Sequence, residues 1–231
     1  MQLPSWMSDL GRGVLDVIYP PRCLGCGARA HRPDLPLCAG CLQSMERAPD
    51  MGVAARLDRL PVAPTALDDA RALWIFDKGG ALQAVQHALK YGDRPAYGAA
   101  LGRIMGRADW ESLPRLSGVV PIPLHRTRLL ERGYNQAAAL GTGMAEALAV
   151  PLRDDLLHRP RPTLSQTDLS RTERWSNVSR AFRAEPEAAG GTWLLVDDIM
   201  TTGSTAVAAA QTLREAGAAS VTLAVLALAR T

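Results

Sequence analysis

The sequence predicts an α/β protein: a parallel β-sheet flanked by helices, preceded by a small module with four cysteines. Short apolar runs alternate with longer segments of helical apolar spacing, which favours parallel strands joined by helical crossovers. The four cysteines all lie within residues 23–41, ahead of these alternating segments. At about 150 residues per domain, the 231 residues suffice for one full domain and a smaller module.

The predicted body begins at residue 70 and alternates strands with helices. Short apolar runs bounded by prolines, glycines or acids predict strands, and longer stretches rich in Ala and Leu predict helices. In chain order these are strand 70–76, helices 80–91 and 97–110, strand 117–122, helix 135–149, strand 193–197, helix 203–216 and strand 219–228. Ligands of parallel sheets bind at the carboxyl ends of the strands, so the chemistry is expected there.

The composition is that of a globular protein. Hydrophobic residues make up 47% of the chain and charged residues 21%, which excludes a disordered tail protein and a disulfide-dense miniprotein. The longest apolar runs, such as 193–196 and 221–228, are too short to span a bilayer. Asp9, Arg12 and Asp16 interrupt the apolar pattern of the N-terminal segment, so we predict no secretory signal and expect a cytoplasmic protein.

Three segments are predicted: an N-terminal helix with the cysteine module at 1–48, a proline-containing linker at 49–69, and the α/β domain at 70–231. The N-terminal helix is predicted to pack onto the module or the body, and docking to a membrane or a partner is the alternative. Its apolar positions are Trp6, Leu10, Val14, Val17 and Ile18.

The cysteines form two C-x2-C pairs, Cys23 with Cys26 and Cys38 with Cys41. A tetrahedral Zn2+ takes four ligands, and two such pairs supply four thiolates. Four thiolates close the coordination shell, so we expect a structural rather than a catalytic zinc. Iron in the same site, unligated or redox-active thiols, and His31 as a competing ligand are the alternatives.

Residues 193–205 read WLLVDDIMTTGST, an apolar strand followed by two acids and a hydroxyl-rich turn that opens a helix. Free N–H groups at a helix start favour a phosphate, while the carboxylates of Asp197 and Asp198 suit sugar hydroxyls or a Mg2+ ion. The combination predicts a ribose 5-phosphate site, and an ordinary capped turn is the alternative. The predicted phosphate residues are Thr201, Thr202, Gly203, Ser204 and Thr205.

The net charge of +3 conceals a basic stretch between residues 126 and 183, with ten arginines and six acids. The guanidinium group donates two parallel hydrogen bonds to phosphate. The loop that follows the strand at 117–122 is therefore a predicted phosphate contact, with a solvated, partly nucleic-acid-facing surface as the alternative. This loop carries Arg126, Arg128 and Arg132, with His125 beside them. A second segment, at 163–178, carries Gln166, Arg171 and Arg174, and an amphipathic hairpin that only packs is one interpretation of it.

Several motifs together resemble one family. VDDIMTTGST resembles the phosphoribosyl pyrophosphate (PRPP) loop of type I phosphoribosyltransferases. With PPRCLGCG, VPIPLHRTRLLERGYNQ and TLSQTDLSRTERWSNV, the chain resembles the ComF family, also called ComF/GntX, over about residues 15–230. The resemblance implies a type I phosphoribosyltransferase-like fold that binds PRPP with Mg2+. It assigns Asp197 and Asp198 to the ribose, residues 201–205 to the 5-phosphate, the first arginine loop to pyrophosphate, and the second to closure over the substrate.

The resemblance implies a protein that transfers or senses a phosphoribosyl group, with a role in DNA uptake and natural transformation. The alternative is a non-catalytic single-stranded nucleic-acid-binding or adaptor protein that retains the fold. The implied partners are PRPP, single-stranded DNA, and a competence helicase or another DNA-uptake protein. Nothing in the sequence identifies the acceptor of the phosphoribosyl group. Base stacking is predicted for Trp6, Tyr19, Tyr134 or Trp175.

Overall fold

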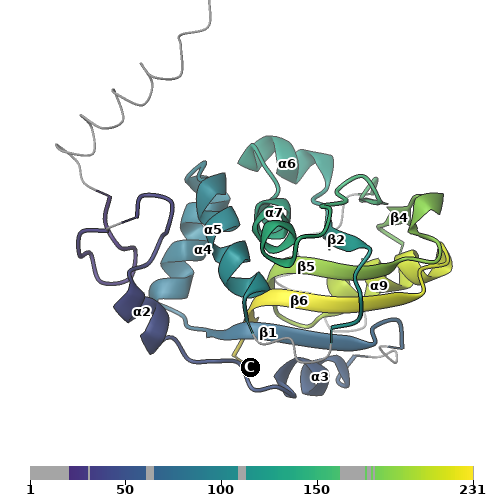
Figure 1. The fold of residues 1–231 in the computed structure, drawn as a ribbon, viewed down its shortest axis with the longest axis horizontal. Coiled ribbons are helices and arrows are strands. Elements are labelled where there is room, and N and C mark those ends of the chain that lie inside the picture. Colours follow the sequence, from purple (N-terminus) through teal and green to yellow (C-terminus); the bar gives the residue numbers. More distant parts are fainter. Residues whose placement is uncertain are drawn as a thin grey trace, which may run out of the picture.

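A four-stranded parallel sheet forms the centre of the computed structural model, which describes residues 21–30, 32–60, 65–108, 113–161, 175, 178 and 180–230. The strand order is β1-β6-β5-β2, and every neighbouring pair is parallel (Figure 1). The strands are β1 (Asp69–Phe76), β2 (Gly118–Pro121), β5 (Thr192–Met200) and β6 (Ser220–Ala229). The predicted parallel sheet with flanking helices is confirmed.

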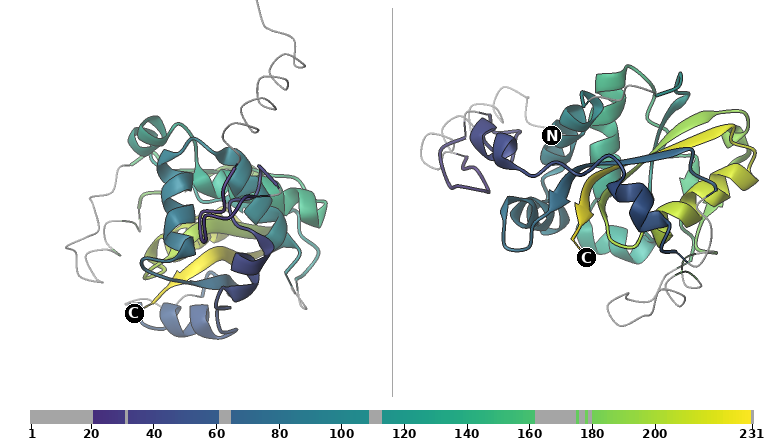
Figure 2. Two further views of the ribbon diagram at one scale, coloured as in Figure 1. Left: turned by 90° about the vertical axis from the view of Figure 1, so that its left-hand side faces the viewer. Right: turned by 90° about the horizontal axis from the view of Figure 1, so that it is seen from below.

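Helices cover both faces of the sheet (Figures 1 and 2). On one face lie α4 (Ala81–Tyr91), α5 (Pro95–Gly106) and α7 (Gln136–Leu148); on the other lie α3 (Gly52–Leu57) and α9 (Ser204–Glu215). Alternate residues of β5 enter the two cores. Leu194 packs in the core with α4, α5 and α7, and Leu195 in the core with α3 and α9. Strand β5 is thus buried on both sides, as its continuous apolar run predicts.

Helices α5 and α7 approach each other closely through glycines. A Cβ at Gly143 would lie 1.9 Å from the carbonyl oxygen of Ala99, and a Cβ at Gly102 would lie 2.0 Å from that of Leu140. These distances are far below van der Waals contact, so only glycine permits this spacing of the two backbones.

Strand β5 is longer than the predicted strand at 193–197 and continues to Met200. Ile199 and Met200 pair with Ala227 and Leu228, because the ten-residue strand β6 supplies backbone partners beyond the acidic pair. The acids therefore lie within the strand and do not follow its end, which corrects the sequence-based expectation.

Some helices form where none was predicted, among them α3, within the segment predicted as a linker, and α6 (Arg126–Arg132), within the first arginine loop. Residues 46–48 also pair with β1, since the N–H of Ile75 donates to Glu46 and the N–H of Ala48 donates to Leu73. The domain limits stay a prediction, but residues 46–48, at the end of the predicted module, already pair with the sheet.

The cysteine module lies beside α4 and α5 and contains α2 (Ala39–Ser44) (Figure 1). The smaller elements β3 (Leu157–His158), β4 (Arg183–Ala184) and the 3-10 helix η1 (Pro186–Ala188) complete the described structure. Strands β3 and β4 pair antiparallel. The predicted N-terminal helix lies outside the described residues.

Candidate functional site

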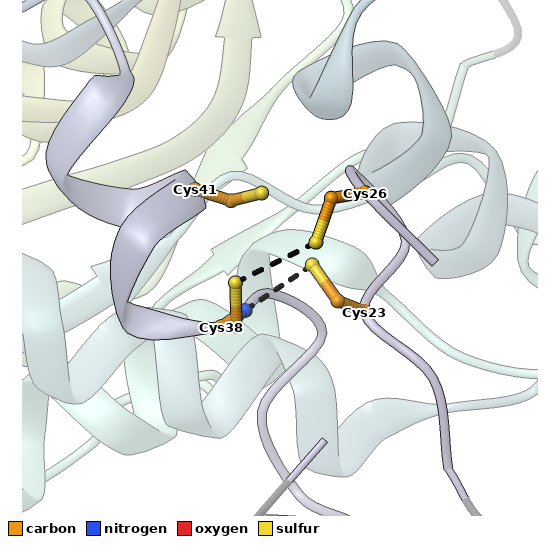
Figure 3. Close-up of side chains that lie close together, drawn as sticks. All are labelled: Cys23, Cys26, Cys38 and Cys41. Carbon is orange, nitrogen blue, oxygen red and sulfur yellow. Dashed lines mark hydrogen bonds between the residues drawn. The ribbon is translucent and has the colours of Figure 1, made fainter. Parts of the chain in front are cut away.

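The four cysteines converge in the N-terminal module. Cys23 and Cys26 lie in the turn before α2, Cys38 caps α2, and Cys41 lies within it; their Sγ atoms point toward one another (Figure 3). All four Sγ atoms are within 4.8 Å of one another, and those of Cys26 and Cys38 are 3.8 Å apart. A tetrahedral zinc with Zn–S bonds of about 2.3 Å has S–S edges of about 3.8 Å. The donor set therefore fits a structural zinc.

The cysteine module shares its core with the body. Cys23 is 2% exposed and Leu37 is 1% exposed, both in the core formed with α4, α5 and α7. Asp34 binds Arg103 of α5 at 3.4 Å. Burial would raise the pKa of Cys23, but hydrogen bonds from the backbone of Cys26, Cys38 and Gly25 outweigh it and lower the pKa to about 6, which favours the thiolate.

The acidic pair lies near the carboxyl end of β5. Asp197 and Asp198 are both half-buried, and each carboxylate accepts a hydrogen bond from the next backbone N–H, at 2.9 Å for Asp197 and 2.7 Å for Asp198. Desolvation raises the pKa of Asp197 to about 8, and repulsion from Asp198 adds to the shift. A desolvated carboxylate next to a second carboxylate forms a site that a bound cation or hydroxyl donors would stabilise.

The hydroxyl-rich turn connects β5 to α9. Gly203 caps the helix with a φ of 86°, and a Cβ there would lie 2.4 Å from Cδ2 of Leu57. The hydroxyls of Thr202 and Ser204 are 3.1 Å apart, and Ser204 is buried while Thr201 is exposed. The helix start and its hydroxyls thus lie in one turn directly after the acidic pair, as expected for a phosphate site.

Helix α3, which lies on the same face of the sheet as α9, holds this turn in place. Arg56 donates to the carbonyl oxygen of Thr201 at 2.5 Å and to that of Ala229, at the end of β6, at 2.7 Å. The side chain of Leu57 packs against Gly203. Sequence reasoning missed Arg56, because nothing in the order of residues connects a proline-flanked segment to a turn that follows 145 positions later.

The first arginine loop forms α6, whose N-cap is His125. Its Nδ1 accepts a hydrogen bond from the N–H of Thr127 at 3.3 Å. Arg126 is exposed and lines a cavity of about 590 Å³. Arg128 forms an ion pair with Glu131 at 3.0 Å, whereas Arg132 donates to Gln136 at 2.9 Å. The three predicted phosphate arginines are therefore in different settings, and only Arg126 among them lines the cavity.

Tyr134 connects α6 and α7 to the end of α4. Its hydroxyl donates to the carbonyl oxygen of Leu89 at 2.5 Å, and the buried Gln136 donates to the same oxygen at 3.2 Å. Burial raises the pKa of Tyr134 to about 12, with smaller contributions from the negative charges of Asp93 and Asp198. The end of α4 is thus fixed to Tyr134 and Gln136, between α6 and the start of α7.

Arg159 is a second residue that sequence reasoning missed. It follows β3, lines the same cavity as Arg126, and its guanidinium carbon lies 5.2 Å from the centre of the Phe182 ring. Burial lowers the pKa of Arg159, and attraction to Asp197 partly offsets this. The signal available in the sequence was its place directly after the short apolar strand that ends at His158, but only the fold brings it near Asp197.

Most of the second arginine loop lies outside the described residues, and with it Gln166, Arg171 and Arg174. The same holds for His31, Trp6 and Tyr19. Trp175 is described and packs partly buried against the core with α3 and α9. Within the described ranges, no helix is both long and apolar enough to cross a membrane.

Known proteins resemble both parts of the chain. The sequence profile of the phosphoribosyl transferase domain matches residues 135–231, and that of the double zinc ribbon domain matches residues 14–51. The DNA utilization protein YhgH of Salmonella typhi is 33% identical over 205 residues, which cover 86% of this chain and 80% of that protein. Competence protein F of Haemophilus influenzae is 34% identical over 102 residues, covering 43% of this chain and 44% of that protein.

Among solved structures, a glutamine PRPP amidotransferase from B. subtilis, complexed with ADP and GMP, shares 22% sequence identity. It aligns with a TM-score of 0.42 over 60% of this chain and 30% of that one. The two profiles and the relatives agree with the four clustered cysteines and the parallel sheet. The chain therefore belongs to the ComF family, in which a four-cysteine zinc module precedes a phosphoribosyltransferase-like domain.

Proposed function

We propose that the chain binds PRPP as its Mg2+ complex at the carboxyl edge of the sheet and transfers or senses the phosphoribosyl group. The observation that supports this is the acidic pair of β5, followed directly by the glycine-capped start of α9. Asp197 and Asp198 would hold the ribose hydroxyls and the bound Mg2+. The hydroxyls and free N–H groups of residues 201–205 would hold the 5-phosphate.

In the transfer reaction, a nucleophile forms a bond to the anomeric carbon of PRPP as the bond from that carbon to the pyrophosphate oxygen breaks. The electron pair of the broken bond leaves with pyrophosphate. The protein would contribute positioning and charge neutralisation, so the reaction does not require a dedicated general base. The arginines proposed for the pyrophosphate group are Arg126, Arg128, Arg132, Arg171 and Arg174.

Calorimetric titration of the zinc-loaded chain with PRPP and Mg2+ tests the site. Asp198→Asn should weaken PRPP binding about 100-fold, since charge-assisted hydrogen bonds to the ligand are lost. Asp154→Asn is the matched control, because Asp154 is an exposed acid outside the site. The proposal fails if the wild type shows no PRPP binding, or if Asp198→Asn binds PRPP as the wild type does.

A second candidate function is binding of single-stranded nucleic acid during DNA uptake or natural transformation, in the cytoplasm, with a competence helicase or another uptake protein as partner. The names of the relatives, DNA utilization protein and competence protein, favour it. The exposed surface of α6 favours this function as well. Arg126 and Arg128 are exposed there beside Leu130, which is 75% exposed.

Fluorescence anisotropy with a labelled oligonucleotide tests this second function. Affinity should fall steeply with salt, and replacing both Arg126 and Arg128 with Gln should reduce the slope of log affinity against log salt by about two. Added PRPP separates the two functions, because competition indicates a shared site. A flat anisotropy curve at low salt would exclude direct nucleic-acid binding.

A further inference from the structure

A cavity of about 590 Å³ separates α6 from the segment that follows β3. Arg126 and His125 line it from the start of α6, and Arg159 lines it from the opposite side. Glu131 is the acidic residue in its described lining, and its carboxylate already binds Arg128 at 3.0 Å. The two guanidinium groups therefore leave the cavity with excess positive charge, which selects for an anion.

Arg159 is held in place before any ligand arrives. Its guanidinium carbon lies 5.2 Å from the centre of the Phe182 ring, within the range of a cation–π contact. Arg159 directly follows β3, and Phe182 directly precedes β4, the strand that pairs with β3 where Leu157 faces Ala184. A cation fixed by its neighbours loses little conformational freedom when it binds an anion.

The surroundings of Arg159 also favour an anionic ligand. The guanidinium is desolvated, which lowers its pKa, and attraction to Asp197 offsets only part of this effect. An anion bound in the cavity would offset more of the cost of desolvating the guanidinium. Arg159 thus lines a cavity suited to an anion, and its charge also interacts with Asp197, the carboxylate proposed to hold the ribose.

We propose that Arg159 is a ligand-contacting residue whose guanidinium binds the pyrophosphate group of PRPP in this cavity. The proposal rests on the proposed function and deepens it by assigning the cavity to a diphosphate anion. It also ranks the arginines. Arg159 and Arg126 should contribute most, because both line the cavity, whereas Arg128 and Arg132 do not.

Calorimetric titration of the full zinc-loaded chain with three separate ligands tests the assignment: PRPP, pyrophosphate and ribose 5-phosphate, each with Mg2+. Arg159→Gln should weaken PRPP and pyrophosphate binding about tenfold or more, as expected for a lost charge-assisted hydrogen bond. Ribose 5-phosphate, which lacks the pyrophosphate group, should bind within about twofold of the wild type. Arg159→Lys should lie between the two, because it keeps the charge and loses the bidentate geometry.

Arg107→Gln is the matched control, because Arg107 is an exposed arginine at the end of α5 and outside the lining of the cavity, and it should leave all three affinities within about twofold of the wild type. Equal loss of all three ligands in Arg159→Gln, with Arg159→Lys no better, would mean a structural role and overturn the assignment. Unchanged pyrophosphate binding in Arg159→Gln would overturn it as well. If the wild type binds pyrophosphate through Arg159 but binds neither PRPP nor ribose 5-phosphate, the anion site stands and the proposed function fails.

Discussion

The cysteine centre and the acidic site both gather groups of like charge, but the chain assembles them in different ways. The four thiols come from one short stretch, Cys23 to Cys41, folded around a turn and α2. The acidic site draws on residues as far apart as Arg56 and Ser204. The cysteine centre is a local structure, so the spacing of its cysteines in the sequence already predicts its geometry. The acidic site exists only once the sheet has formed.

Removal of the zinc is expected to have the largest effect. It tests whether the stability of the cysteine centre is independent of that of the body. Cys41→Ser should abolish zinc binding and lower the free energy of unfolding by several kcal/mol, since structural zinc binding is coupled to folding. Because Cys23 and Leu37 belong to the core with α4 and α5, the α/β body should also unfold at a lower temperature.

Zinc content and thermal melting with and without a chelator measure this effect. Ser44→Ala is the control, because Ser44 lies in the same helix and its hydroxyl only donates to the carbonyl of Cys41. Full zinc content in Cys41→Ser would contradict the assignment of Cys41 as a ligand.

Gly203→Ala tests the acidic site at its turn. The added methyl meets both a left-handed backbone, with φ of 86°, and the side chain of Leu57 at 2.4 Å. We expect a loss of about 2–3 kcal/mol in the free energy of unfolding, measured by urea denaturation, together with weaker PRPP binding. In a Leu57→Ala background the same change should be less destabilising, because the clash is removed and only the backbone strain stays. An equal loss in both backgrounds would show that the contact with Leu57 does not matter.

The pH dependence of stability separates the two sites further. The pKa of Asp197 is raised to about 8 in the folded protein, above its ordinary value of 3.8, so the protonated form stabilises the fold. As pH rises from about 4 to about 8, the unfolded chain ionises first, and the free energy of unfolding should fall by at most about 1.4 kcal/mol per pH unit.

Asp197→Asn should remove this contribution and flatten the curve of unfolding free energy against pH in the ligand-free protein. Urea denaturation at a series of pH values measures it, with Asp154→Asn as the matched acid outside the site. A slope in Asp197→Asn as steep as in the wild type would place the titrating group elsewhere.

Arg56→Met is expected to have the smallest effect, because it acts on the turn through one carbonyl. Release of the Thr201 carbonyl should weaken PRPP binding about threefold to tenfold, the value of about one ordinary hydrogen bond, because the loss acts on the ligand only through the turn. Arg59→Met is the control, since Arg59 is exposed on the segment that follows the same helix. A change in thermal stability without a change in affinity would limit Arg56 to a structural role.

The sequence predicted the sheet well, because its strands are marked by apolar runs between breakers. The helix predicted at 203–216 forms as Ser204–Glu215, and the strand predicted at 219–228 forms as Ser220–Ala229. The sequence-based prediction was wrong about the end of β5. The acidic pair indicates a strand end, but β6 offers further backbone partners and the strand continues to Met200. The prediction was also wrong about α3, a short helix whose stability comes from burial of Val53 and Leu57 in the core, a tertiary effect.

The residues of the candidate site divide in the same way. The cysteines, the acidic pair and the hydroxyl-rich turn are contiguous motifs, so residue type and spacing suffice to predict a chemistry for them. Arg56, Tyr134 and Arg159 make their contacts across long separations in the chain, and each alone resembles an ordinary surface or core residue. The ion pair of Arg128 with Glu131, one helical turn away, is likewise seen only in the structure.

The pairing of residues 46–48 with β1 has a consequence for the protein at high concentration. Edge strands offer free backbone groups on which another chain can add a strand and start aggregation. Here the connection to the zinc module occupies part of one edge, while Val119 on the opposite edge exchanges hydrogen bonds with residues 151 and 153. The chain therefore protects both borders of its sheet with its own backbone, and we expect this to limit strand exchange between copies.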